Sequence, residues 1–244
     1  MRFPPALPAG LVLAAAGCAS TKPDFGVEVD HVSRYVARGA VLFDGPALQP
    51  AFTVTATRAE GTLSGGIWST IDEDDHGGNA WNFTEVDYHV EYERSFGAWK
   101  TTLGLLRYDY PHTGFAASGE VHVAAGYENE IATPTLHLWY DYDQANGSYV
   151  DLELAREFEL GERWSLALMT SIGRMSRGQG SYYFGVDEEG FSDFTSTAAL
   201  SYSPNETFGF ALTLGWASVL DGDYREASVR GDNGWLMLGA QAGF

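Results

Sequence analysis

Acidic side chains recur at every second position along several segments of the chain. In the segment 82–96 they alternate with valines and tyrosines, and the segments 134–143 and 148–158 follow the same pattern. Successive side chains of a strand point to opposite faces, so this spacing gathers carboxylates on one face and apolar side chains on the other. We predict that the acidic face lines a lumen and carries Glu85, Asp87, Glu91, Glu93, Glu120, Asp141, Asp143, Asp151, Glu153 and Glu157.

Few bases oppose these acids, and the candidates for positive charges in the lumen are Arg34, Arg38 and Arg107. Rings of carboxylates attract cations and exclude anions, because a narrow tube with low-dielectric walls concentrates their field. The pattern therefore predicts a pore that passes small solutes and prefers cations. The alternative is a plugged barrel whose carboxylates are solvated or paired with arginine.

Three histidines, His89, His122 and His137, also fall on the polar face. A metal site would require them to cluster with carboxylates, but they lie on separate segments whose relative heights the sequence does not define. The acidic segment 72–78 could hold a divalent cation through oxygen ligands, yet it lacks the spacing of a calcium loop. We expect no metal and no cofactor, since the chain also lacks a phosphate loop and a dinucleotide fingerprint.

Catalysis is a rival hypothesis, because long loops that carry acids and His76 could perform general acid–base chemistry. Serine, histidine and acid do not fall in a spacing typical of a catalytic triad. We therefore predict no catalytic residues and no enzyme. A barrel hydrolase, such as an outer-membrane phospholipase or protease, and a structural or adhesive barrel without a pore remain the alternatives.

The elements that must position these side chains are strands, because period-two alternation continues through about 12 segments, an even number typical of bacterial barrels. The segments run to about ten residues, longer than most globular strands and suitable for crossing a bilayer at a tilt. Their predicted bounds are 25–37, 47–58, 62–71, 82–96, 99–110, 119–128, 134–143, 148–158, 164–174, 190–202, 207–218 and 233–244.

The connectors between these segments mostly alternate between short turns and long loops. Short turns on one side and long loops on the other are typical of outer-membrane barrels, whereas a soluble sandwich has no reason to sort its loops in this way. Many apolar faces also end in aromatic residues, which could form girdles at the two membrane interfaces. The sequence therefore predicts an all-β fold: a closed, up-and-down antiparallel transmembrane β-barrel of about 12 strands with periplasmic termini.

Composition excludes another class of function. The 244 residues include 33 acids and 14 bases, a net charge of −19. This negative charge would repel the phosphate groups of a nucleic acid, so we expect no nucleic-acid partner. Apolar residues make up 45% of the chain, which argues against disorder.

The first 17 residues carry one base, no acid and an apolar run that ends in small residues, which is typical of an export signal. Cys18 follows Ala15-Ala16-Gly17, a partial match to a lipobox, so Cys18 is the candidate lipidation site, with ordinary cleavage nearby as the alternative. We expect a signal peptide at 1–17, a linker at 18–24 and a barrel at 25–244.

The segment 233–244 places an apolar series on one face and ends on Phe244, which resembles the assembly signal of bacterial outer-membrane proteins. The expected location is the outer membrane of a diderm bacterium. The expected partners are outer-membrane lipid and lipopolysaccharide, the barrel-assembly machinery, and small solutes or cations. Nothing in the sequence identifies an oligomeric interface.

The first predicted hairpin, 32–50, resembles the opening of the TorF family of porins. That family begins its barrel with a Ser-Asp-Tyr-x-x-Arg-Gly strand followed by a Pro-Ala-x-Gln strand, and a second patch at 85–121 is similar to its middle strands. Arg34 stands where the family usually has Asp. The resemblance implies an outer-membrane barrel of unproven transport role and no catalytic residues. The matching residues are Ser33, Tyr35, Arg38, Gly39, Pro46, Ala47 and Gln49.

Overall fold

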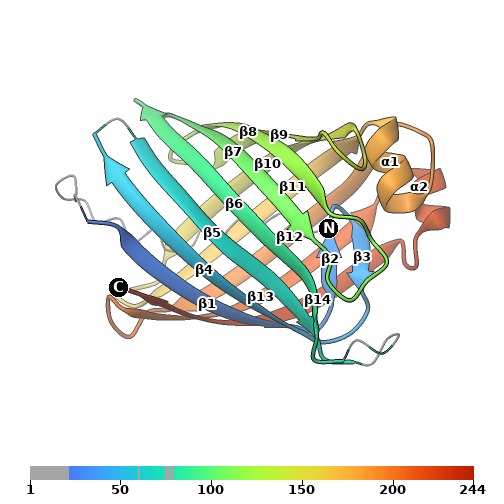
Figure 1. Cartoon of the computed structure of the whole chain (residues 1–244). Helices are drawn as coiled ribbons and strands as arrows, with labels where there is room; N and C mark the ends of the chain where they lie inside the picture. The colour runs from blue at the N-terminus through green and yellow to red at the C-terminus, as the bar shows by residue number, and fades with distance from the viewer. Residues whose placement is uncertain (1–21, 60, 75–77, 79) are drawn as a thin grey trace.

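The computed structural model describes residues 22–59, 61–74, 78 and 80–244. It is a closed barrel of 12 antiparallel strands, as predicted (Figure 1). The predicted signal peptide and Cys18 lie outside the described residues.

Each strand of the barrel wall pairs with the next one along the chain, and β1 closes the ring by pairing with both β4 and β14. The observed bounds agree with the predicted segments to within one or two residues at most ends. In chain order the wall consists of β1 (Asp24–Val32), β4 (Ala47–Arg58), β5 (Gly61–Asp72), β6 (Phe83–Phe96), β7 (Trp99–Asp109), β8 (Ser118–Tyr127), β9 (Thr133–Asp141), β10 (Gly147–Glu159), β11 (Trp164–Met175), β12 (Gly190–Tyr202), β13 (Phe208–Val219) and β14 (Asp232–Gly243).

The barrel closes along the seam between β1 and β14, which pair from Gly26↔Gly243 to Val32↔Met237. Just beyond this register Phe25 and Phe244 exchange two backbone hydrogen bonds of 3.0 and 2.9 Å. Phe244 therefore lies at the seam, with its side chain exposed. Closure pairs the edges of the first and last strands, which an open sheet would leave exposed.

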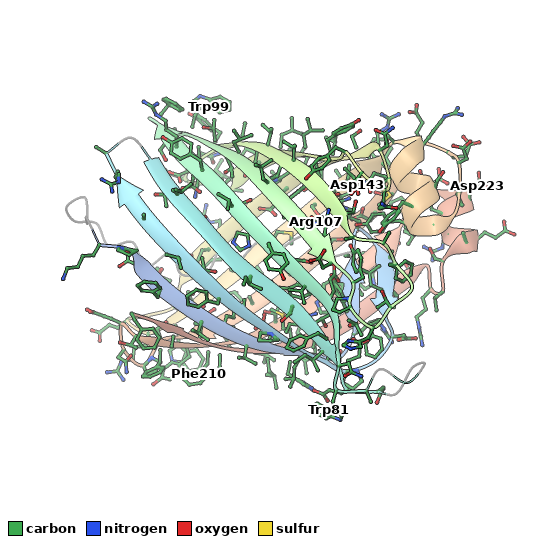
Figure 2. All side chains as sticks on the ribbon, viewed as in Figure 1. Trp81, Trp99, Arg107, Asp143, Phe210 and Asp223 are labelled. Atoms are coloured by element: carbon green, nitrogen blue, oxygen red, sulfur yellow. The ribbon has the colours of Figure 1, made fainter. Side chains whose placement is uncertain are left out.

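The outer surface of the barrel is apolar, because the outward positions of the alternating strands carry large hydrophobic side chains. Aromatic rings pair across neighbouring strands near the short-turn end, where the ring centroids of Trp99 and Tyr127 are 5.1 Å apart and those of Trp164 and Tyr202 are 4.6 Å apart. Figure 2 shows Trp99 and Phe210 projecting from opposite sides of this end. Such bands are typical of interfacial girdles.

The first predicted strand, 25–37, is wrong in one respect. β1 ends at Val32, and the chain then forms a separate hairpin of β2 (Tyr35–Ala37) and β3 (Ala40–Phe43). The predicted loop 38–46 is therefore partly a strand, and the hairpin lies at the long-loop end of the barrel together with the helices (Figure 1).

Two short helices also lie at this end: α1 (Arg177–Phe184) and α2 (Gly222–Ala227). The sequence did not predict them, since elements of 8 and 6 residues are too short to show a periodic apolar stripe. Among the described residues, neither is long and apolar enough to cross a membrane.

Buried side chains fill the interior at the long-loop end. Tyr108, Trp139 and Tyr149 project inward from the wall, and the partly buried Leu42 of β3 and Tyr183 of α1 pack against their cluster. We call the hairpin 35–43 and helix α1 together the plug. The plug turns this end of the barrel into a packed core, whereas the lumen below it remains lined by polar groups.

Candidate functional site

The tip of the plug hairpin is a tight turn formed by Arg38 and Gly39. Their φ angles are +49° and +78°, and positive values at both central residues are characteristic of a type I′ turn. A left-handed conformation is uncommon for arginine, so the contacts of its side chain must compensate for the backbone. The turn aims the Arg38 guanidinium into the barrel, where its side chain is fully buried.

Glu120 of β8 receives this guanidinium in a bidentate ion pair. Nη1 of Arg38 donates to Oε1 of Glu120 at 3.0 Å, and Nη2 donates to Oε2 at 3.0 Å. Nη1 also donates to the side-chain carbonyl of Gln179 in α1 at 2.9 Å, and the hydroxyl of Tyr108 donates to Oε2 of Glu120 at 2.9 Å. Both charged side chains are 0% exposed, so the pair is held by its bidentate geometry and by the hydrogen bonds of Nη1 and Nη2.

Three aromatic rings surround the same guanidinium. Its central carbon lies 4.5 Å from the ring centroid of Tyr149, 5.3 Å from that of Tyr183 and 6.0 Å from that of Trp139. The faces of aromatic rings attract cations within about 6 Å, most strongly where water is excluded. Glu120, Gln179 and these three rings, here called the cation cage, form an environment complementary to a planar cation.

A second set of contacts fastens the base of the hairpin to the rim of the barrel. Asp44 accepts hydrogen bonds from Nε of Arg34 at 2.6 Å and from Nη2 of Arg230 at 3.1 Å. The hydroxyl of Tyr35 donates to Glu85 at 2.9 Å in the interior. The plug is thus held at its base by partly exposed ion pairs and at its tip by a buried one.

The ion pairs at the base of the hairpin predict that the stability of the plug depends modestly on pH. The hydrogen bond from Arg34 holds the pKa of the Asp44 carboxyl below its usual range. A carboxyl whose folded pKa is lowered contributes stability above its unfolded pKa of about 3.9, and this contribution is lost as the pH falls through the folded value. We expect hydrogen exchange of the 40–43 amides of β3, corrected for intrinsic rate, to accelerate below about pH 4 by an amount corresponding to about 1 kcal/mol or less. Asp44→Asn should remove this acceleration, and equal pH dependence in the variant would contradict the assignment.

A polar cluster lines the lumen on the short-turn side of the cation cage. Nδ1 of His122 lies 3.0 Å from a carboxylate oxygen of Glu91, and its Nε2 lies 3.1 Å from Nδ1 of His137. The His122 ring stacks on Trp139 with centroids 3.6 Å apart and 4° between planes. Gly104 lies between Glu91 and His122 in the sheet, and a Cβ there would approach the Glu91 carboxylate to 2.9 Å. The missing side chain at Gly104 therefore allows the two groups to meet.

The structure brings most of the predicted lumen acids to the interior, but in different environments. Glu85, Asp87, Glu120, Asp141 and Asp151 are buried, and Asp141 accepts the Ser118 hydroxyl at 2.6 Å. The half-buried acids on inward positions of their strands are Glu91, Glu93 and Glu153, and Glu157 is exposed near the short-turn end of β10.

Two predicted lumen residues lie on the outside instead. Arg107 alternates with the buried Leu106 and Tyr108, so it shares the outward face of β7, and its guanidinium lies 3.4 Å from Asp109 and 3.6 Å from Asp143. Asp143 is exposed beyond the end of β9, near the same rim (Figure 2). Because β7 carries apolar residues on both faces next to the plug, its alternation does not reveal which face is inward. Arg34 lies at the rim and Arg38 in the plug.

Several residues of the cage were not singled out by the sequence. Gln179 and Tyr183 lie in a connector without periodicity, and Trp139 stands on the polar face of its strand. One signal was available: an aromatic residue at an inward position, as Tyr149 also is, indicates that something packs against it inside the barrel.

No protein-family model and no curated protein sequence matches the chain. Solved structures do match it. The chain is similar to the KdgM porin at 8% identity and a TM-score of 0.54, over 90% of this chain and 99% of that one. It is similar to an outer membrane channel from Pseudomonas putida F1 at 9% identity and a TM-score of 0.58, over 95% and 98%. It is similar to the NanC porin at 11% identity and a TM-score of 0.56, over 88% and 98%. These similarities extend over the whole barrel and show its fold.

Proposed function

We propose that the protein is an outer-membrane channel that passes small cationic solutes, and that the plug closes its long-loop end. The observation that carries this proposal is a closed barrel that is apolar outside and encloses carboxylates. An apolar outer surface suits lipid, and enclosed carboxylates favour cations over anions. The solved porins and channel of similar fold support a channel of this class.

The acids below the plug are the ones that set the selectivity in this proposal. Glu91, Glu93 and Glu153 are half-buried on inward faces, so their potentials add in one lumen. Asp141 is unsuited to this role because it is fully buried, with its carboxylate bound by Ser118 and by the backbone of the following turn.

Replacing Glu91, Glu93 and Glu153 by glutamine should lower the ratio of cation to anion permeability by on the order of a few-fold, because three lumenal charges are lost. The measurement is the reversal potential across a planar bilayer under a salt gradient, repeated at low and high ionic strength, since screening weakens the effect. Glutamine at the exposed turn residues Glu130, Glu162 and Glu206 is the matched control, with the same charge change outside the lumen. Equal shifts in both triple variants would contradict the assignment.

The residues that match the TorF motif have structural roles at the plug. Ser33 forms backbone and hydroxyl hydrogen bonds with Leu236 at 2.9 Å, Tyr35 binds Glu85, and Arg38 and Gly39 form the tip of the plug. The unusual Arg34 forms the ion pair with Asp44 at the rim. The motif therefore corresponds to the plug and its attachment.

Location in the outer membrane, after export, assembly by the barrel machinery and contact with lipopolysaccharide, is part of the same proposal. Folded barrels resist detergent, so an unboiled sample should migrate differently from a boiled one on a detergent gel and fractionate with the outer membrane. Mass spectrometry of the mature N-terminus tests lipidation of Cys18. Recovery as a soluble periplasmic protein would contradict the membrane location.

A second candidate is a permanently closed, structural barrel, favoured by the packed core at the long-loop end. It predicts that neither the wild-type protein nor variants with a displaced plug conduct ions across a bilayer. The hydrolase alternative gains no support from His122, the histidine held by Glu91, because its other ring nitrogen lies against His137 rather than a serine.

A further inference from the structure

We infer that the cation cage is a binding site for a solute that carries a guanidinium group, and that Arg38 occupies this site as an internal substitute while the barrel is closed. This inference rests on the proposed channel function. It names the chemistry of the solute, which the carboxylates of the lumen alone leave undefined.

The groups of the cage belong to parts of the protein other than the hairpin. Glu120, Trp139 and Tyr149 stand on wall strands β8, β9 and β10, and Tyr183 stands on α1. A closed barrel holds wall residues in place whatever the hairpin does, so Glu120, Trp139 and Tyr149 keep their positions when the guanidinium leaves. A site that persists without its occupant can accept a solute of the same shape and charge.

The geometry matches a guanidinium in particular. The two oxygens of Glu120 each accept one of two parallel N–H groups at 3.0 Å, a fork that a planar guanidinium provides and an ammonium does not. Gln179 accepts a further N–H, and the rings of Tyr149 and Tyr183 lie within cation–π distance of the central carbon. The site thus provides acceptors for both Nη groups and aromatic rings around the central carbon.

Two further acids lie near the cage. Asp151 and Asp193 lie within electrostatic reach of its guanidinium in addition to Glu120, so one cation faces three acids. Asp193 is held by hydrogen bonds from Ser192 at 2.7 Å and Tyr149 at 3.2 Å. A cationic solute that replaced Arg38 would therefore face the same three acids.

The hairpin is built in a way that permits its withdrawal. β2 and β3 pair with each other in a sheet separate from the barrel, so removing them breaks no strand pairing of the wall. Arg38 has a φ of +49°, a conformation that relaxes when the tip contacts are released. A solute that competes for Glu120 would shift the hairpin toward the withdrawn state.

The test measures binding of methylguanidinium to the full-length protein folded in phospholipid vesicles, with urea as the neutral planar analogue. Arg38→Asn vacates the cage and keeps the turn, since Asn-Gly is the preferred type I′ pair. We expect calorimetry to detect tighter methylguanidinium binding to Arg38→Asn than to the wild type, in which Arg38 competes for the same site. The double variant Arg38→Asn/Glu120→Gln should bind about 10- to 100-fold more weakly, because a charge-assisted hydrogen-bonded pair is lost. Urea should bind none of them.

A second measurement uses the wild type, so that misfolding of a variant leaves the inference falsifiable. Methylguanidinium should accelerate hydrogen exchange of the 36–43 amides by competing for Glu120, and urea at the same low concentration should not. No acceleration, or equal acceleration by urea, would overturn the inference, as would binding to Arg38→Asn that is insensitive to Glu120→Gln. Binding without conductance would overturn the channel and keep the site, whereas conductance without binding would overturn the site and keep the channel.

Discussion

Glu120→Leu releases the tip of the plug and costs about 3–5 kcal/mol of its stability, the largest effect we expect from a single substitution. The reason is that the Arg38 guanidinium, fully buried against Glu120, would be left without its charge partner. The measurement is hydrogen exchange of the 36–43 amides in phospholipid vesicles, where exchange should accelerate by about a hundredfold or more. Amides 165–168 of β11, at the short-turn end of the wall, should be unaffected.

Glu93→Gln is the control for this prediction. Glu93 also forms an ion pair, with Lys100 at 2.8 Å, but both side chains are 37% exposed, so its loss should cost about 1 kcal/mol or less. Adding Arg38→Asn to Glu120→Leu should recover part of the lost stability, because no unpaired charge then remains buried. Additive losses in the double variant would show that the ion pair does not hold the plug.

Gly39→Ala should displace the tip of the plug and raise conductance in planar bilayers. Gly39 has a φ of +78°, and a Cβ added there would lie 2.7 Å from Cβ of Asp193, which is too close for the backbone to stay in place. The left-handed conformation alone costs about 1–2 kcal/mol for a residue with a side chain, and the steric clash adds to it. Because the adjacent Arg38 depends on this turn, its contacts with Glu120 should weaken as well.

Gly97→Ala is the control that separates the backbone strain of a left-handed alanine from displacement of the plug. Gly97 lies in the turn between β6 and β7 with a φ of +62°, and an added Cβ there would meet nothing within 4 Å. This variant should show the backbone cost without a change in conductance. A Gly39→Ala channel that conducts no better than Gly97→Ala would contradict the role of the hairpin as the closing element.

The barrel wall could be predicted from the order of residues along the chain. Period-two alternation is a local property of an extended chain, and the requirement that one face meet an apolar medium preserves it along every wall strand. The strands 47–58 and 190–202 were therefore predicted with the bounds that the structure has. The short and long connectors likewise indicated which end would carry the elaborated loops.

The contents of the barrel depend on contacts between distant parts of the chain. Arg38 binds Glu120 and Gln179, which are 82 and 141 positions away in the chain, and such contacts leave no periodic signal. Strands of three and four residues and helices of six and eight are too short for alternation to define. Contacts with the plug also explain why Arg107 was placed on the wrong face. The inner face of β7 is apolar at Leu106 and Tyr108, where it packs against the plug. The two faces of β7 therefore do not differ in polarity, and the sequence could not show which face Arg107 occupies.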